Sequence, residues 1–244
     1  MLELRNVSFQ VLDDKDQQRN ILTDISLNIP SGCFIAITGP NGSGKSSLAK
    51  IIMGIERPTQ GHIIFDGEDI TRLDIHERAR AGIGFAFQQP VRFKGIQVRD
   101  LLRLSAGREL SLDEACGYLS QVGLCAVDYI FRELNHSLSG GEMKRIEIAT
   151  LMARNVRLSL FDEPEAGIDL WSFQNLIRVF EQLREQTQGT VVVISHQERI
   201  LEIADRIIVM EGGRIARDGS REEILPQLLL GADDCRFYGR RVIS

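Results

Sequence analysis

Short apolar runs alternate with stretches of helical composition along most of the chain. Residues 1–29 alternate apolar and polar positions around a polar segment at 13–19, which predicts strands joined by a solvated hairpin loop. Apolar runs at 34–38, 157–161 and 190–195 have the length of strands. The last of these is rich in β-branched residues, as is typical of a strand buried in a parallel sheet. We therefore expect an α/β fold with a mixed or parallel sheet.

The pattern changes in the middle of the chain, where helical composition replaces strand periodicity. Three helices are predicted there, at 98–104, 112–122 and 141–153. We interpret residues 91–155 as an inserted α-helical subdomain. Residues 1–90 and 156–244 then form the core, which begins with an antiparallel β subdomain.

One glycine-rich loop lies between a strand-length apolar run and a predicted helix. Residues 39–47 fit the pattern G-x-x-x-x-G-K-[ST], in which backbone N–H groups turn inward around phosphate oxygens. The lysine of this pattern reaches the terminal phosphates and the hydroxyl residue binds Mg²⁺. The alternative is a glycine-rich turn without a ligand, but strand, loop and helix all occur in the required order. The predicted nucleotide-binding residues are Gly39, Pro40, Asn41, Gly42, Ser43, Gly44, Lys45, Ser46 and Ser47.

A second loop of small residues, Ser139-Gly140-Gly141-Glu142, stands at the start of a long helix. In physical terms it resembles the first loop, because unpaired N–H groups at a helix start favour an anion. One nucleotide has one terminal phosphate group. Two anion sites about a hundred residues apart therefore suggest that two subunits share each nucleotide, although the fold could also bring both sites together within one chain.

Two adjacent carboxylates, Asp162 and Glu163, follow the predicted strand at 157–161. Carboxylates are costly to place beside each other without a cation. We expect Asp162 to hold Mg²⁺ through water and together with Ser46, while Glu163 orients and polarises the attacking water. An acidic exit from the strand without chemistry is the alternative.

Other polar residues stand where predicted strands end. Gln88 can present its amide at the carboxyl edge of the sheet, where α/β proteins bind ligands. His196 can hydrogen-bond a terminal phosphate there, or it can be a structural histidine. Asp169 is a candidate N-cap for the helix that follows it. Near the N-terminus, Phe9 could stack on adenine, but a core position is the favoured interpretation.

Composition narrows the choice of partners. The chain has 244 residues and a net charge of −5, which argues against nucleic acid as the main partner. No apolar run approaches the ~18 residues of a membrane-spanning helix, and we see no signal peptide. We expect a cytoplasmic protein whose membrane role, if any, requires another chain. The four cysteines show no metal-site spacing and receive no function.

Taken together, these motifs resemble those of ABC-type ATPases over nearly the whole chain. The Walker A loop at 39–47, a Q-loop at Gln88, the signature at 138–142, a Walker B strand ending in Asp162 and Glu163, a D-loop at 167–169 and the switch residue His196 occur in the family order. The resemblance implies a P-loop NTPase core, ATP and Mg²⁺ as ligands, and a head-to-tail homodimer that sandwiches two ATP molecules. Each ATP would lie between Walker A of one chain and the signature of the other.

The resemblance also assigns roles to individual residues. It implies Glu163, His196, Lys45 and Gln88 as catalytic residues and Ser46, Gln88 and Asp162 as the metal site. Beyond the Walker A loop, it implies nucleotide contacts from Ser139, Gly140, Gly141, Glu142 and Asp169.

Within the family, three stretches are similar to the ATPase of the Suf iron–sulfur assembly system. They are 87–91 with Gly95 after it, 140–148 and 196–201. Leu138 and the run 163–166 depart from that subgroup. The favoured interpretation is a motor for soluble scaffold proteins of iron–sulfur assembly. The alternative is the ATP-binding subunit of a membrane transporter, bound peripherally to transmembrane permease subunits. A third interpretation, an ATP-gated clamp without hydrolysis, would need a defective site, yet Glu163 and His196 are both present.

Overall fold

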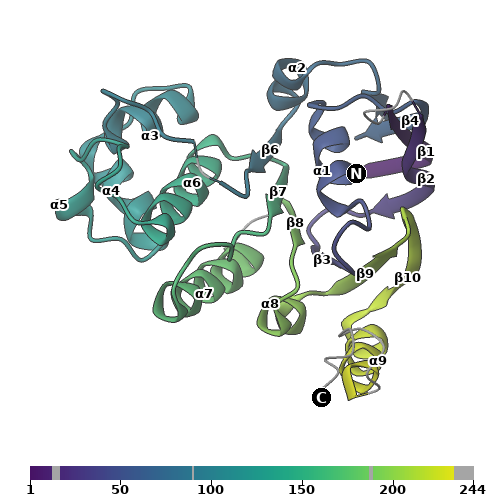
Figure 1. The fold of residues 1–244 in the computed structure, drawn as a ribbon. Helices are drawn as coiled ribbons and strands as arrows, with labels where there is room; N and C mark the ends of the chain where they lie inside the picture. Colours follow the sequence, from purple (N-terminus) through teal and green to yellow (C-terminus); the bar gives the residue numbers. More distant parts are fainter. Residues whose placement is uncertain (13–16, 90, 187–188, 234–244) are drawn as a thin grey trace. The chain divides into compact units, whose positions relative to one another are not determined.

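The computed structural model describes residues 1–12, 17–89, 91–186 and 189–233. The chain forms two compact units, one of Met1–Leu73 with Ile194–Ser244 and one of Asp74–Val193. Each unit combines strands and helices, which confirms the expected α/β class (Figure 1).

The first unit contains an antiparallel sheet with the strand order β2-β1-β4-β5. Its strands are β1 (Leu2–Leu12), β2 (Gln18–Ile29), β4 (Gln60–Phe65) and β5 (Glu68–Asp69). Leu2 lies opposite Ile29 and Leu4 opposite Leu27, and all four side chains are buried. The alternation of apolar and polar positions therefore gives this sheet one core face, as predicted. Phe9 is also buried, which agrees with the favoured core interpretation.

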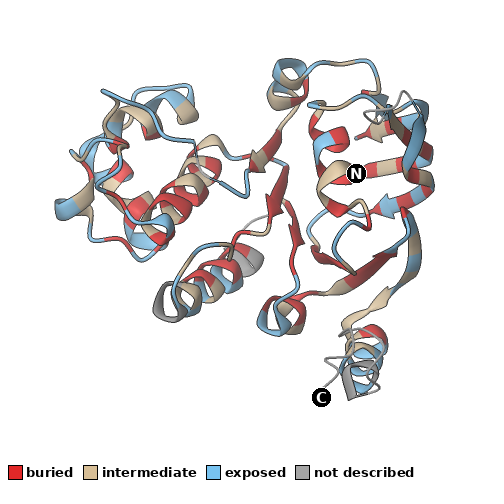
Figure 2. Cartoon of the chain, viewed as in Figure 1, coloured by how far each residue is buried: buried red, intermediate tan, exposed pale blue. Residues whose placement is uncertain are grey.

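A second set of strands in the first unit carries the glycine-rich loop. Strand β3 (Phe34–Thr38) pairs in parallel with β9 (Arg206–Glu211), and β9 pairs antiparallel with β10 (Arg214–Ser220). Every residue of β3 is buried, so its backbone is fixed up to the start of the loop (Figure 2). The helices of this unit are α1 (Lys45–Met53), α8 (Glu198–Ile203) and α9 (Arg221–Asp233).

The second unit contains the strands β6 (Ile83–Ala86), β7 (Leu158–Asp162) and β8 (Thr190–Ile194), in the order β8-β7-β6; only the last residue of β8 belongs to the first unit. Strands β6 and β7 are parallel, with Ile83 opposite Leu158 and Ala86 opposite Phe161. All residues of β7 and β8 are buried, as the apolar runs predict (Figure 2).

The helices of the second unit begin with α2 (Ile75–Arg80) and end with α7 (Leu170–Gln186). Between them lie the helices of the predicted helical region: α3 (Val98–Ala106), α4 (Leu112–Gln121), α5 (Ala126–Tyr129) and α6 (Gly140–Arg154). Within α2, Arg78 is fully buried. Within the described residues, no helix combines the length and apolarity that a bilayer crossing requires.

Candidate functional site

The glycine-rich loop leaves β3 at Thr38 and enters α1 at Lys45. Gly39 has φ 133° and Gly44 has φ 95°, both in the region that L side chains rarely adopt. A Cβ atom on Gly39 would lie 1.9 Å from the carbonyl oxygen of Met210, and one on Gly44 would lie 2.6 Å from Leu22 Cδ2. Only glycine fits these two positions, so the loop is held tightly against β9 and β2.

Polar groups of this loop are arranged as an anion site requires. Lys45 is 5% exposed, and its Nζ donates to the carbonyl oxygens of Gly39 at 2.8 Å and Pro40 at 3.0 Å. The Oγ of Ser43 is buried and has no hydrogen-bond partner among the described residues. A buried hydroxyl without a partner is unfavourable, and a phosphate oxygen would satisfy it. Ser46 and Ser47 occupy the first turn of α1, where N–H groups lack intrahelical partners. These residues fit a bound phosphate.

His196 lies at the same sheet edge of the first unit. The backbone N–H of Ser195 donates to the carbonyl oxygen of Ile37 at 3.1 Å, and the Ser195 side chain accepts from the Gln197 N–H at 2.9 Å. Ile37 is two residues before Gly39, so this contact brings His196 to the strand end where the glycine-rich loop begins. The His196 side chain is exposed.

In the second unit, the predicted carboxylates meet Gln88. Asp162 ends β7 and is 5% exposed, whereas Glu163 follows with a left-handed φ of 44°. The Nε2 of Gln88 donates to Glu163 Oε2 at 2.6 Å. The parallel register of β6 and β7 explains this pairing, because both strands leave the sheet at one edge. A left-handed φ is uncommon for glutamate and occurs often at functional positions.

The second small-residue loop forms the N-terminus of α6. Ser139 Oγ accepts from the N–H of Glu142 at 3.3 Å, and the N–H of Ser139 donates to Glu142 Oε2 at 2.6 Å, which completes a capping box. The hydroxyl of Tyr129 also donates to Glu142. Burial raises the pKa of Glu142, but the bonds from Tyr129 and Ser139 outweigh it and the net pKa is lowered. The helix end thus already carries one ionised carboxylate, which the sequence alone did not indicate.

The signature loop and the predicted D-loop are neighbours in the second unit. A Cβ atom on Gly140 would lie 3.2 Å from the carbonyl oxygen of Gly167. The carbonyl of Asp169 accepts from the N–H of Phe173 at 2.9 Å, so Asp169 stands at the start of α7 as predicted. The structure therefore gathers the predicted residues in two groups. The first unit holds 39–47 with His196, and the second holds Gln88, Asp162 and Glu163, with the loop at 139–142 beside 167–169.

Two further residues belong to the neighbourhood of Gln88 and were not identified from the sequence. Lys144 and Glu147 of α6 both bind the main chain of Phe87, directly before Gln88. The available signal was a lysine and a glutamate three residues apart on a helix, which usually marks an exposed face.

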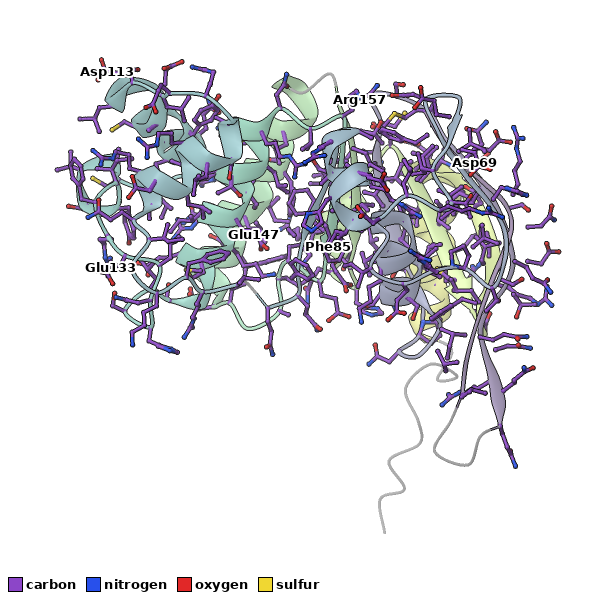
Figure 3. All side chains as sticks on the ribbon, turned by 90° about the horizontal axis from the view of Figure 1, so that it is seen from above. Asp69, Phe85, Asp113, Glu133, Glu147 and Arg157 are labelled. Carbon is purple, nitrogen blue, oxygen red and sulfur yellow. The ribbon has the colours of Figure 1, made fainter. Side chains whose placement is uncertain are left out.

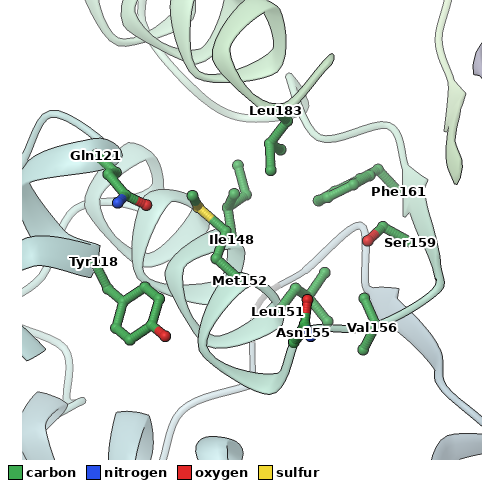
Figure 4. A pocket seen from close by; sticks show the side chains of 10 residues that line it. All are labelled: Tyr118, Gln121, Ile148, Leu151, Met152, Asn155, Val156, Ser159, Phe161 and Leu183. Atoms are coloured by element: carbon green, nitrogen blue, oxygen red, sulfur yellow. The ribbon is translucent and has the colours of Figure 1, made fainter. Parts of the chain in front are cut away.

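The described residues also contain a cavity of about 170 Å³ in the second unit (Figure 4). It is lined by Tyr118, Gln121, Ile148, Leu151, Met152, Asn155, Val156, Ser159, Phe161 and Leu183. No predicted site residue lines it, so the cavity is not the nucleotide site. Nor do three or more His, Cys, Asp or Glu side chains gather as a metal cluster among the described residues, and the predicted Mg²⁺ site, with one carboxylate, needs none.

Comparison with known proteins identifies the relatives of this arrangement. Residues 22–166 match the family described as ABC transporter. The chain is 39% identical to an uncharacterized ABC transporter ATP-binding protein of Methanocaldococcus jannaschii, over 84% of this chain and 85% of that protein. It is 34% identical to the lipopolysaccharide export system ATP-binding protein LptB of Acidithiobacillus ferridurans, over 86% and 88%.

Other comparisons extend the same picture. The chain is 37% identical to the sulfate/thiosulfate import ATP-binding protein CysA of Bacillus cereus, over 83% of this chain and 58% of CysA. Its fold is similar to the dimeric structure of a post-hydrolysis state of an ATP-binding cassette bound to ADP and Pi, with a TM-score of 0.80 and 27% identity, over 91% of this chain and 99% of that one.

Proposed function

Because this chain belongs to the ABC transporter family of ATP-binding proteins, we propose that it is the ATP-hydrolysing subunit that drives a membrane permease. It is an ATPase of the cassette type, with ATP and Mg²⁺ as its ligands. One observation carries the choice of partner: relatives of 34–39% identity, matched over more than four-fifths of this chain, are named as transporter ATP-binding proteins.

This proposal reverses the order of the two interpretations drawn from the sequence. None of the relatives reported above is named as an iron–sulfur assembly protein, and two of them are named for export or import. The similarity of 87–91, 140–148 and 196–201 to the Suf ATPase keeps soluble scaffold proteins as the competing partner. The hydrolysis site is the same in both interpretations, so only the partner separates them.

We assign phosphate binding to the loop at 39–47. In our proposal the Nζ of Lys45 leaves the carbonyl oxygens of Gly39 and Pro40 for the terminal phosphates, and the buried Ser43 hydroxyl donates to a phosphate oxygen. Ser46, Gln88 and Asp162 are the residues that would hold Mg²⁺, which when bound offsets the charge of the phosphates.

We assign water activation to Glu163. Its carboxylate would accept a hydrogen bond from the attacking water, whose oxygen bonds to the γ-phosphorus as the bond to the ADP oxygen breaks. The hydrogen bond from Gln88 to Glu163 Oε2 supports this role, because it orients the carboxylate. His196 would donate a hydrogen bond to the γ-phosphate from the edge at which the loop begins.

We further propose that each site is completed by a second copy of the chain. Ser139, Gly140, Gly141 and Glu142 would contact the γ-phosphate bound to the partner's loop, with Asp169 beside them. The dimeric form of the similar cassette supports this arrangement. ATP binding would then close the dimer, and hydrolysis would reopen it.

The permease contact is assigned to the segment around Gln88, at Phe87 and residues 91–94. Three apolar side chains are exposed there: Phe87 (37%), Val91 (49%) and Phe93 (38%). Exposed apolar clusters on such proteins mark interaction sites. Arg92 and Lys94 alternate with them, which suits a partner segment that is apolar with acidic flanks.

The partner can be identified by affinity purification of the tagged protein from cytosol and from a detergent extract of membranes. We expect a polytopic membrane protein in the detergent extract, and Phe93→Asp should abolish its recovery. Leu12→Asp is the matched control, since Leu12 is 65% exposed on β1, outside this segment, and its variant should still recover the partner. Recovery of soluble scaffold proteins alone would replace the permease by an iron–sulfur assembly complex.

A further inference from the structure

A buried pair of opposite charges, Lys144 and Glu147, lies in the second turn of α6. Lys144 is 2% exposed and the Glu147 side chain is 15% exposed. Glu147 lies among the side chains between α6 and β6 (Figure 3). The Nζ of Lys144 is 3.9 Å from Glu147 Oε2, too far for a strong hydrogen bond. The main contacts of both side chains are made elsewhere.

Both members of the pair bind the same residue, Phe87. The backbone N–H of Phe87 donates to Glu147 Oε1 at 3.1 Å, and Lys144 Nζ donates to the carbonyl oxygen of Phe87. The ladder between β6 and β7 ends one residue earlier, at Ala86 and Phe161. Where the strand pairing ends, side chains of α6 thus hydrogen-bond the main chain in place of a neighbouring strand.

The held residue directly precedes Gln88. With both backbone groups of Phe87 fixed, the direction in which Gln88 leaves the strand is fixed as well. Gln88 then donates to Glu163 Oε2 at 2.6 Å. The helix that supplies the clamp begins at Gly140, directly after Ser139. One rigid element therefore connects the signature loop to the residue that contacts Glu163.

We propose that Lys144 and Glu147 are positioning residues that fix Gln88 against Glu163 and make the loop after β6 move with α6. This rests on the proposed roles of Gln88 and Glu163. The pair itself touches neither substrate nor the attacking water.

The desolvation cost of the Lys144–Glu147 pair favours a role for it other than stabilising the fold. Burial raises the pKa of Glu147 to about 7 and lowers the pKa of Lys144, so each charge is held against its desolvation cost. Buried ion pairs can often be replaced by apolar residues without loss of stability. A clamp on Phe87, however, needs one acceptor and one donor at these two positions, and apolar side chains supply neither.

The test is a variant that keeps the volume of the pair but removes both contacts, Lys144→Met with Glu147→Leu. Hydrogen exchange measured by mass spectrometry should accelerate at least about tenfold in the peptide that contains Phe87, while the peptides of α6 stay protected. Unchanged exchange at Phe87, or faster exchange throughout Asp74–Val193, overturns the proposal. This measurement needs no ATP. It therefore tests whether Lys144 and Glu147 hold Phe87 even if the protein hydrolyses no ATP and the proposed function fails.

Kinetics give a second readout that a structural role would not move. We expect the double variant to lower kcat about tenfold or more with an unchanged KM for ATP, and Gln88→Ala to have no further effect in that background. Losses that multiply would refute positioning through Gln88. Arg154→Met is the matched control, because Arg154 is a part-buried cation of α6 that donates to Ala79, far along the helix from Phe87, and its effect should multiply with that of Gln88→Ala. If the double variant does not fold, hydrogen exchange in the same peptide is compared between Glu147→Ala and Glu147→Gln. Exchange should be faster in Glu147→Ala, because Glu147→Gln retains an acceptor for the N–H of Phe87, and equal exchange would overturn the proposal.

Discussion

The side-chain nitrogen of Gln88 donates to Glu163 Oε2 at 2.6 Å, although the two residues are 75 positions apart in the sequence. The parallel register of β6 and β7 brings them together at one sheet edge. Glu163 has a left-handed φ of 44°, so its backbone conformation is unfavourable for glutamate and must be imposed by its surroundings. The structure thus fixes both the backbone and one oxygen of the carboxylate to which we assign water activation.

Glu163→Gln should therefore retain ATP binding and lose turnover. The amide keeps the shape of the side chain but cannot polarise water as a carboxylate does, and we expect phosphate release to fall at least about a hundredfold. In the presence of ATP, the variant should then accumulate as a stable dimer, which size-exclusion chromatography with light scattering detects. Hydrolysis at the wild-type rate would remove Glu163 from this role.

Lys45→Ala should weaken nucleotide binding itself. The variant removes the one ammonium group of the glycine-rich loop, and a charge-assisted hydrogen bond to phosphate accounts for at least about a tenfold rise in the Kd for ATP. Titration calorimetry measures this directly. Lys50→Ala is the control, because Lys50 lies exposed on the same helix and its loss should leave the Kd unchanged. Equal affinities of the Lys45→Ala variant and the wild type would contradict the assignment.

Gly39→Ala should destabilise the fold as well as the loop. The new methyl group would meet the carbonyl oxygen of Met210 at 1.9 Å, so β9 or the loop must shift. We expect the free energy of unfolding to fall by at least about 2 kcal/mol in chemical denaturation. Gly42→Ala separates the clash from backbone strain, since Gly42 also has a positive φ but a Cβ there meets nothing within 4 Å. An equal loss in both variants would mean that the contact with Met210 is unimportant.

Glu147 should make stability depend on pH. Burial raises the pKa of the folded carboxyl to about 7, against 4.5 when it is unperturbed, although Lys144 and the N–H of Phe87 oppose the rise. The unfolded chain therefore loses this proton first, and the contribution of Glu147 to the free energy of unfolding falls as pH rises from about 4.5 to 7.

The measurement is denaturation of the wild type and of Glu147→Gln across this range. Their difference should change by at most about 3 kcal/mol in favour of the variant as pH rises, and then level off. Lys144 faces Glu147, and Asp162 and Glu165 act on Lys144, so both proteins must be compared at each pH. A constant difference from pH 4.5 to 8 would show that Glu147 ionises normally.

The parts of the site that the sequence predicts are those with local causes. Gly39 and Gly44 stand where only glycine fits, and Ser139 with Glu142 forms a capping box, so each loop is visible within a few residues. Burial of Arg78, Lys144 and Glu147 depends instead on what packs against their helices, which the spacing of charges does not show. The partner class has no comparable local signal. The hydrolysis residues are shared between both kinds of system, and the exposed surface near Phe93, to which we assign the partner contact, follows no rule that can be read from neighbouring residues.

The composite site makes the strictest prediction, because it concerns two chains at once. Lys45→Ala disables phosphate binding by the loop at 39–47 of the chain that carries it. Ser139→Arg blocks the signature loop of the chain that carries it with a bulky charged side chain. Each variant alone should form dimers in which both sites are defective. A mixed dimer should contain one site with both defects and one site built from the intact loop of one chain and the intact signature of the other.

Mixing the two inactive variants in equal amounts should therefore restore phosphate release. Random pairing makes half of the dimers mixed, and each mixed dimer has one intact site of two, so we expect about a quarter of the wild-type rate if the sites act independently. Mixing Lys45→Ala with Glu163→Gln is the control, since in the mixed dimer Glu163→Gln disables the site that retains Lys45. No recovery in the first mixture, despite exchange of subunits shown by fluorescence transfer, would mean that each nucleotide is bound and cleaved within one chain. Recovery in the control would mean that the Lys45 and Glu163 of one site come from different chains, which contradicts the proposed division of the site.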